Sequence, residues 1–126
     1  MRDETLALVR RIAGHRGALE TQDLAEWTGR AYSDRLLNGL ALGIARAYDG
    51  GALPFAEAAA TMDDLAGLVT RLASDGDAPE VRLPSPFWDI YEAFDEGTYP
   101  HGDTDDPETE FTRPKIAAIL ADEGRP

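Results

Sequence analysis

"SDRLLNGLALGIARAYDGG", residues 33–51, predicts the longest helix of the chain. Ser33 is a typical N-cap residue, and Gly50-Gly51 is a typical stop. The large apolar residues between them recur every three or four positions, which places them along one side of a helix. They are Leu36, Leu37, Leu40, Ile44 and Tyr48.

Helix signals of the same kind recur on both sides of this stretch, and alternating strand patterns are nearly absent. Further helices are predicted over residues 4–14, 22–29, 53–60, 62–76, 87–96 and 113–124. Their expected start signals are Asp3, Thr21, Pro54, Thr61, Ser85 with Pro86, and Thr112. The expected core contains Leu6, Val9, Leu24, Leu36, Leu40, Ile44, Leu65, Leu68, Leu72, Ile90, Phe94, Ile116 and Ile119.

The sequence therefore predicts an all-α fold. A chain of 126 residues is about one domain. We expect a single helical domain over residues 1–126, with six to seven helices in an irregular bundle or orthogonal array. An acidic loop is expected at about residues 97–111, where prolines and glycines interrupt the helix pattern.

The charge of the chain is strongly uneven. Residues 1–50 carry seven arginines and seven acids, whereas residues 51–126 carry five bases and seventeen acids, which is the whole net charge of −12. Binding to a nucleic-acid backbone or an anionic membrane needs clustered lysine and arginine, so direct binding to either is not expected. A basic protein or a divalent cation is the electrostatically favoured partner.

Cysteine is absent, so neither disulfides nor thiolate metal sites are possible. The first residues lack the apolar stretch of a signal peptide, and no segment is long and apolar enough to span a bilayer. A cytoplasmic location is the expectation. Motifs of nucleophile elbows, phosphate-binding loops and zinc proteases are missing too, so the sequence favours a non-enzymatic role without a cofactor.

Gly39 and Gly43 lie four residues apart and therefore on one side of the predicted helix. Each glycine inside a helix costs about 1 kcal/mol relative to alanine, so a close approach should offset it. The expected cause is tight packing against another helix of the same chain. A homodimer formed through this pair is the alternative.

The region from Asp89 to Glu110 carries nine acids and no lysine or arginine. Such a run is often only a solvated surface. It could also bind a basic protein, because clustered carboxylates speed the encounter with a positive surface. That hypothesis assigns partner binding to Trp88, Asp89, Glu92, Asp95, Glu96, Tyr99, Asp103, Asp105 and Asp106.

Proteins of this physical character include inhibitors, immunity proteins and antitoxins, some of which occupy the basic site of a nucleic-acid-binding protein. No motif of a specific family accompanies the pattern. A second hypothesis is a divalent-metal site, in a binding domain or a metal-dependent enzyme, with His101, Asp103 and Asp105 as ligands. The spacing fits an EF-hand poorly, because that loop needs glycine and glutamate where Glu108 and Pro114 stand.

Overall fold

The computed structural model describes residues 3–15, 17, 19–75, 85–99, 102 and 106–123. In chain order the helices are α1 (Asp3–Gly14), α2 (Thr21–Thr28), α3 (Asp34–Asp49), α4 (Phe55–Asp75), α5 (Phe87–Glu96), the π-helical turn η1 (Glu108–Thr112) and α6 (Arg113–Glu123). No strand occurs in these ranges, which confirms the predicted all-α single domain. Within the same ranges, no helix has both the length and the apolar character to cross a membrane.

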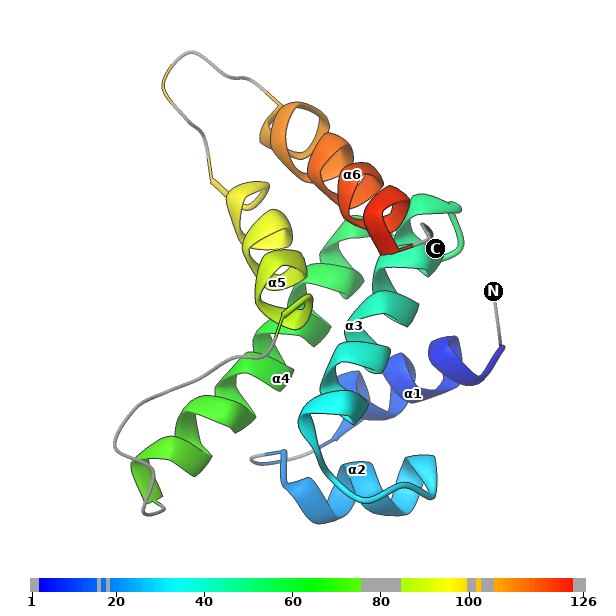
Figure 1. Ribbon diagram of the computed structural model, residues 1–126, viewed down its shortest axis with the longest axis vertical. Helices are drawn as coiled ribbons and strands as arrows, with labels where there is room; N and C mark the ends of the chain where they lie inside the picture. Colours follow the sequence, from blue (N-terminus) through cyan, green and yellow to red (C-terminus); the bar gives the residue numbers. More distant parts are fainter. Residues whose placement is uncertain are drawn as a thin grey trace.

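Helix α3 is the centre of the fold. It packs against α1, α4, α5 and α6, and Figure 1 shows it running through the middle of the molecule. Its N-terminus forms as predicted: Ser33 is extended, and its Oγ accepts a hydrogen bond from the Leu36 N–H at 3.1 Å. Four of the five predicted apolar side chains are buried, whereas Leu40 lies at the margin of the core and is partly exposed.

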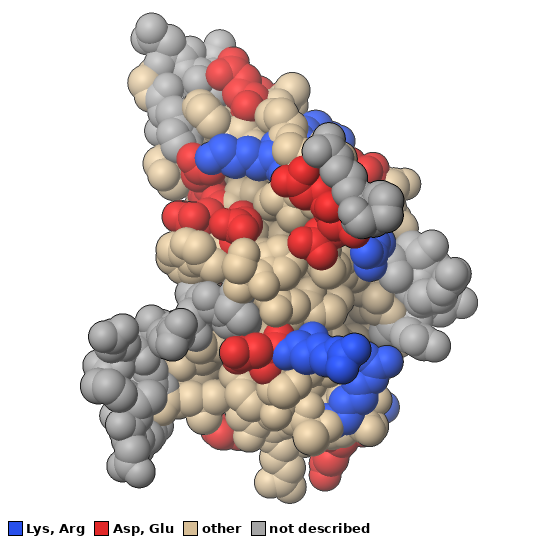
Figure 2. Space-filling model, viewed as in Figure 1, with Lys and Arg blue, Asp and Glu red and all other residues tan. Residues whose placement is uncertain are grey.

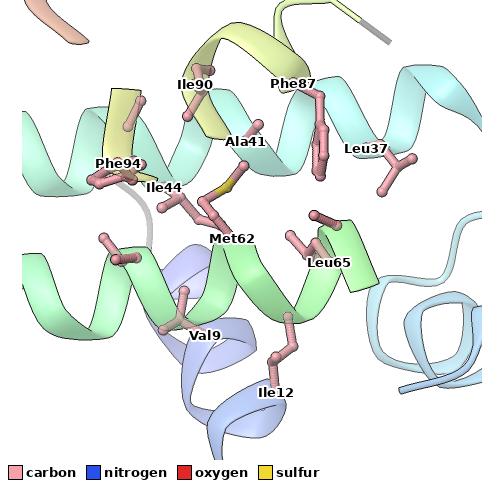
Figure 3. Packing of buried hydrophobic residues seen from close by; sticks show 14 of the residues in the cluster. Val9, Ile12, Leu37, Ala41, Ile44, Met62, Leu65, Phe87, Ile90 and Phe94 are labelled. Atoms are coloured by element: carbon pink, nitrogen blue, oxygen red, sulfur yellow. The ribbon is translucent and has the colours of Figure 1, made fainter. Parts of the chain in front are cut away.

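The core lies where α3, α4 and α5 meet. Figure 3 shows Met62 of α4 pointing toward Ile44 of α3, with Phe87 and Ile90 entering from α5. Phe87, Ile90 and Met62 are fully buried. Burial of each such side chain contributes about 1.5–3 kcal/mol, which fixes the side of α5 that faces inward. On the opposite side of α4, α1 supplies Val9.

Helix α4 is one continuous helix, so the prediction of two helices separated by a cap at Thr61 was wrong. Thr61 is 1% exposed, and its hydroxyl donates to the Glu57 carbonyl oxygen of the preceding turn at 2.8 Å. The alanines before it favour helix, and no glycine or proline interrupts them. Leu72, expected in the core, is 39% exposed.

The starts of α2, α5 and α6 also differ from the prediction. Helix α2 is preceded by Glu20, whose N–H donates to Asp23 Oδ2 at 3.0 Å, so Thr21 is its first residue and not its cap. Helix α5 begins at Phe87, whose N–H donates to Oδ1 of Asn38 on α3 at 3.0 Å. Ser85 therefore caps no N–H and instead donates its hydroxyl to a carboxylate one turn later, Asp89, at 2.9 Å.

Helix α6 does not start with a cap at Thr112. The chain is already helical before it, in the turn η1 that replaces the last part of the predicted acidic loop. The Arg113 N–H donates to the carbonyl oxygen of Glu108, five residues earlier. Pro114 explains this wider turn, because proline has no N–H and its ring clashes with the carbonyl four residues before it.

The two glycines of α3 have different surroundings. Gly43 is buried, and a Cβ at this position would lie 2.9 Å from Oγ1 of Thr5, so α1 approaches α3 closely there. This confirms the expected close packing within the chain at Gly43. Gly39 is exposed, and a Cβ there would meet no atom within 4 Å. A homodimer through the glycine pair stays a prediction, with Gly43 already engaged inside the monomer.

Candidate functional site

Helix α5 has an apolar side and an acidic side. Phe87, Ile90, Ala93 and Phe94 are buried, so the helix can pack on α3 and α4. Because residues three or four apart share a side of a helix, the remaining positions face outward. The exposed residues there are Trp88, Asp89, Glu92 and Asp95, four of the nine predicted for partner binding.

Helix α4 adds the carboxylate of Asp63 to this surface, and Asp64 follows it in the chain. Burial raises the pKa of Asp63, and the negative charges of Asp95 and Asp64 raise it further. Burial likewise raises the pKa of Tyr91, with contributions from Asp63 and Asp95. These shared effects place Asp63, Tyr91 and Asp95 together where α4 meets α5. We define the acidic face as Asp63, Asp64, Asp89, Glu92 and Asp95.

An aromatic pair lies beside these carboxylates. The ring centroids of Trp88 and Tyr91 are 5.6 Å apart, and the ring planes are tilted by 33°. Trp88 is 39% exposed, so much of its indole can still contact another molecule. The acidic face therefore has a hydrophobic neighbour of the residue types that are enriched at the centres of interfaces.

The other margin of α5 borders a shallow groove of about 280 Å³ against α6. Asp89, Glu92 and Glu96 line it from α5, and Lys115 and Ile119 line it from α6. Glu96 is partly buried and forms an ion pair with Lys115 across the groove. Glu96 thus has a structural partner within the chain. Figure 2 shows acidic side chains grouped over α5 and over the C-terminal end of α6.

Two acids of the predicted run stabilise the start of the last helical segment. Asp106 accepts hydrogen bonds from the N–H of Thr109 at 3.2 Å and from its hydroxyl at 2.7 Å, and these bonds lower the pKa of Asp106. Glu108 accepts the Tyr48 hydroxyl at 2.7 Å and lies 3.3 Å from the Arg113 guanidinium. Burial and the Glu108 carboxylate raise the pKa of Tyr48. Asp106 therefore stabilises η1 locally, and Glu108 connects η1 to α3.

Tyr99 follows α5 and is 47% exposed. Three other predicted residues, His101, Asp103 and Asp105, lie outside the described residues, and so does the whole predicted metal site. Among the residues that are described, no group of three or more acids and histidines could hold a metal ion. The metal hypothesis stays a prediction without support from the described part of the chain.

Asp63 and Asp64 are the members of the acidic face that the sequence analysis missed. In the predicted helix that starts after Thr61, they would lie in the first turn and only complement the helix dipole. Because the alanine-rich stretch before Thr61 belongs to the same helix, both residues lie in the interior of α4. The proximity of Asp63 to Asp95 depends on how α4 packs on α5, and no local pattern encodes it.

No protein-family model matches the chain, and no curated protein or solved structure matches it significantly. The structure establishes the class of an all-α single domain. Any function has to be argued from the surface of the molecule itself.

Proposed function

We propose that the chain is a non-enzymatic interaction protein whose acidic face binds a basic protein. The observation that carries the proposal is the packing of α4 on α5 with Asp63 on one helix and Asp95 on the other, where burial and then the charge of Asp95 raise the pKa of Asp63. Like charges held together repel each other and weaken the folded state. Lysines or arginines of a partner would remove that repulsion.

The aromatic pair supports the same proposal. Carboxylates at an interface mainly raise the association rate and discriminate between partners, whereas buried aromatic anchors supply most of the affinity. Trp88 could serve as such an anchor because it is exposed and its ring contacts that of Tyr91, whose pKa is raised by burial and by the charges of Asp63 and Asp95. In physical character the protein would then act as an inhibitor, immunity protein or antitoxin that occupies a basic site.

The test compares two variants of equal charge. The face variant carries D63N, E92Q and D95N. The control variant carries E26Q, D49N and E57Q, which neutralise exposed acids elsewhere on α2, α3 and α4. Tagged wild type and both variants are incubated with lysate of the source cell, washed with rising salt and analysed by quantitative mass spectrometry.

We expect a basic protein to be retained by the wild type and the control variant, released at intermediate salt, and lost with the face variant. Calorimetry with that purified partner should then show an affinity that falls with salt for the wild type and less steeply for the face variant. Equal retention by the face and control variants would contradict the proposed surface.

A further inference from the structure

Gly39 is a mid-helix glycine that packing within the monomer does not explain. A Cβ added there meets no atom within 4 Å, whereas one added at Gly43, one turn later, would lie 2.9 Å from Thr5 Oγ1. The second glycine permits contact between α1 and α3. The first keeps a space open at the surface.

That space is a cavity of about 280 Å³ between α1, α2 and α3. Its apolar walls are Leu8 of α1, Trp27 of α2, and Leu36 and Leu40 of α3, with Gly39 between the last two. Leu8, Trp27 and Leu40 are only partly buried. The cavity therefore leaves apolar surface uncovered.

The Trp27 wall is held in place from outside the cavity. The His15 ring meets the indole edge-on at a centroid distance of 5.6 Å, and the Arg11 guanidinium lies 5.8 Å from the indole centroid. His15 is in turn 3.3 Å from Asp23 of α2. The indole is thus positioned before any ligand enters, which lowers the entropy cost of binding.

Arg30 supplies a positive charge at the cavity. Helix α2 ends at Thr28 and is followed by its C-cap residue Gly29, whose φ of 71° is a left-handed conformation that favours glycine. The Thr28 hydroxyl oxygen then accepts the Arg30 N–H at 3.1 Å, which fixes the turn. A second hollow next to it shares Arg30 and adds Arg35 at the start of α3. No Asp or Glu is among the described residues that line either hollow, in a chain of net charge −12.

We propose that this cavity binds a small organic acid that carries one aromatic or branched aliphatic group. The apolar group would lie between Trp27 and Leu40 over Gly39, and the carboxylate would face Arg30. A small molecule is favoured over a partner helix because the volume is just below the roughly 300–1,000 Å³ of typical ligand pockets. The site is independent of the acidic face.

Nuclear magnetic resonance of the isotope-labelled full chain tests the proposal with 3-phenylpropanoate as the probe and neutral 3-phenylpropanamide as its matched control. The two tryptophan indole N–H signals report the site, and Trp88→Phe identifies which of them belongs to Trp27. We expect the Trp27 signal to shift and saturate at millimolar 3-phenylpropanoate, and the amide to bind at least fivefold more weakly.

Three variants locate the binding. Gly39→Leu should weaken binding of the acid at least tenfold by filling the cavity. Arg30→Gln should make the acid and the amide bind equally. Arg46→Gln, which removes an exposed arginine at the other end of α3, should change nothing. Because Arg30 is exposed, its variant keeps the test decisive even if Gly39→Leu perturbs folding.

A Trp27 signal that does not respond to the acid would overturn the proposal. Wild-type affinity for the acid in folded Gly39→Leu or in Arg30→Gln would overturn it as well. A Trp27 signal that shifts with protein concentration in the absence of the acid would also overturn it, since a second copy of the chain would then occupy the cavity.

Discussion

Replacing Thr112 by valine tests the contact that joins α6 to α5. Thr112 is fully buried, and its hydroxyl donates to the Ala93 carbonyl oxygen at 2.7 Å. In a continuing helix that carbonyl would accept the Gly97 N–H, but the Gly97 N–H donates to the Phe94 carbonyl oxygen at 3.1 Å. Valine keeps the shape of threonine and removes the donor on which Ala93 depends.

The expected loss follows from leaving a buried carbonyl without its donor, which costs about 1–3 kcal/mol. Thr61→Val is the matched control. Thr61 is also buried, but its hydroxyl donates to the Glu57 carbonyl oxygen, which already accepts a backbone N–H within α4. This second substitution should therefore cost less than about 1 kcal/mol, the net value of an ordinary hydrogen bond.

Urea unfolding followed by far-UV circular dichroism measures both variants. With a slope of about 2 kcal/mol per molar urea, the Thr112→Val midpoint should fall by roughly 0.5–1.5 M. The slope itself should not change. Equal losses in the two variants, or an unchanged midpoint for Thr112→Val, would refute the assigned role of the hydroxyl.

Gly97→Ala should lower the free energy of unfolding by about 1–3 kcal/mol or more, because the added Cβ would clash with Oγ1 of Thr112 and lie 2.9 Å from the Phe55 ring, and overpacking costs about that much. Gly39→Ala should raise the free energy of unfolding by up to about 1 kcal/mol, since its Cβ meets nothing; urea melts check both signs. Tyr48→Phe should lower it by about 1.5–3 kcal/mol in the same assay, because it removes the 2.7 Å hydrogen bond to a carboxylate. Asp63→Asn should stabilise the protein at neutral pH. The folded-state pKa of Asp63 lies above 3.8, so its ionisation weakens the fold as pH rises from that value to the folded-state pKa. Melts below about pH 3.5 should show no such gain, and a gain of equal size there would contradict the assigned cause.

Signals confined to one turn of helix predicted much of the fold. Ser33 marked the start of α3 because a cap acts on an N–H only three residues away. On α5, Ile90 and Phe94 are buried as predicted, and Asp89, Glu92 and Asp95, which are predicted for partner binding, are exposed. Their role in binding stays a prediction.

The errors fall where a residue that resembles a cap, or an N–H expected to be capped, has another partner in the fold. Thr61 and Thr112 both resemble caps in the sequence, yet each donates its hydroxyl to a carbonyl from a buried position. The first N–H of α5 is satisfied by Asn38, which lies 49 residues earlier in the chain. A sequence pattern cannot indicate such a partner, because the packing of α3 against α5 creates it.

The sequence by itself determined the helical class, the inward side of each major helix and the confinement of the negative charge to residues 51–126. These properties depend on residue type and on spacings of a few residues. Only the tertiary structure decided that Asp63 lies near Asp95, that Gly43 contacts Thr5, and that Gly39 opens onto a cavity beside Arg30. The physical reason is that helix packing brings together residues far apart in the chain, and both candidate sites lie where different helices meet.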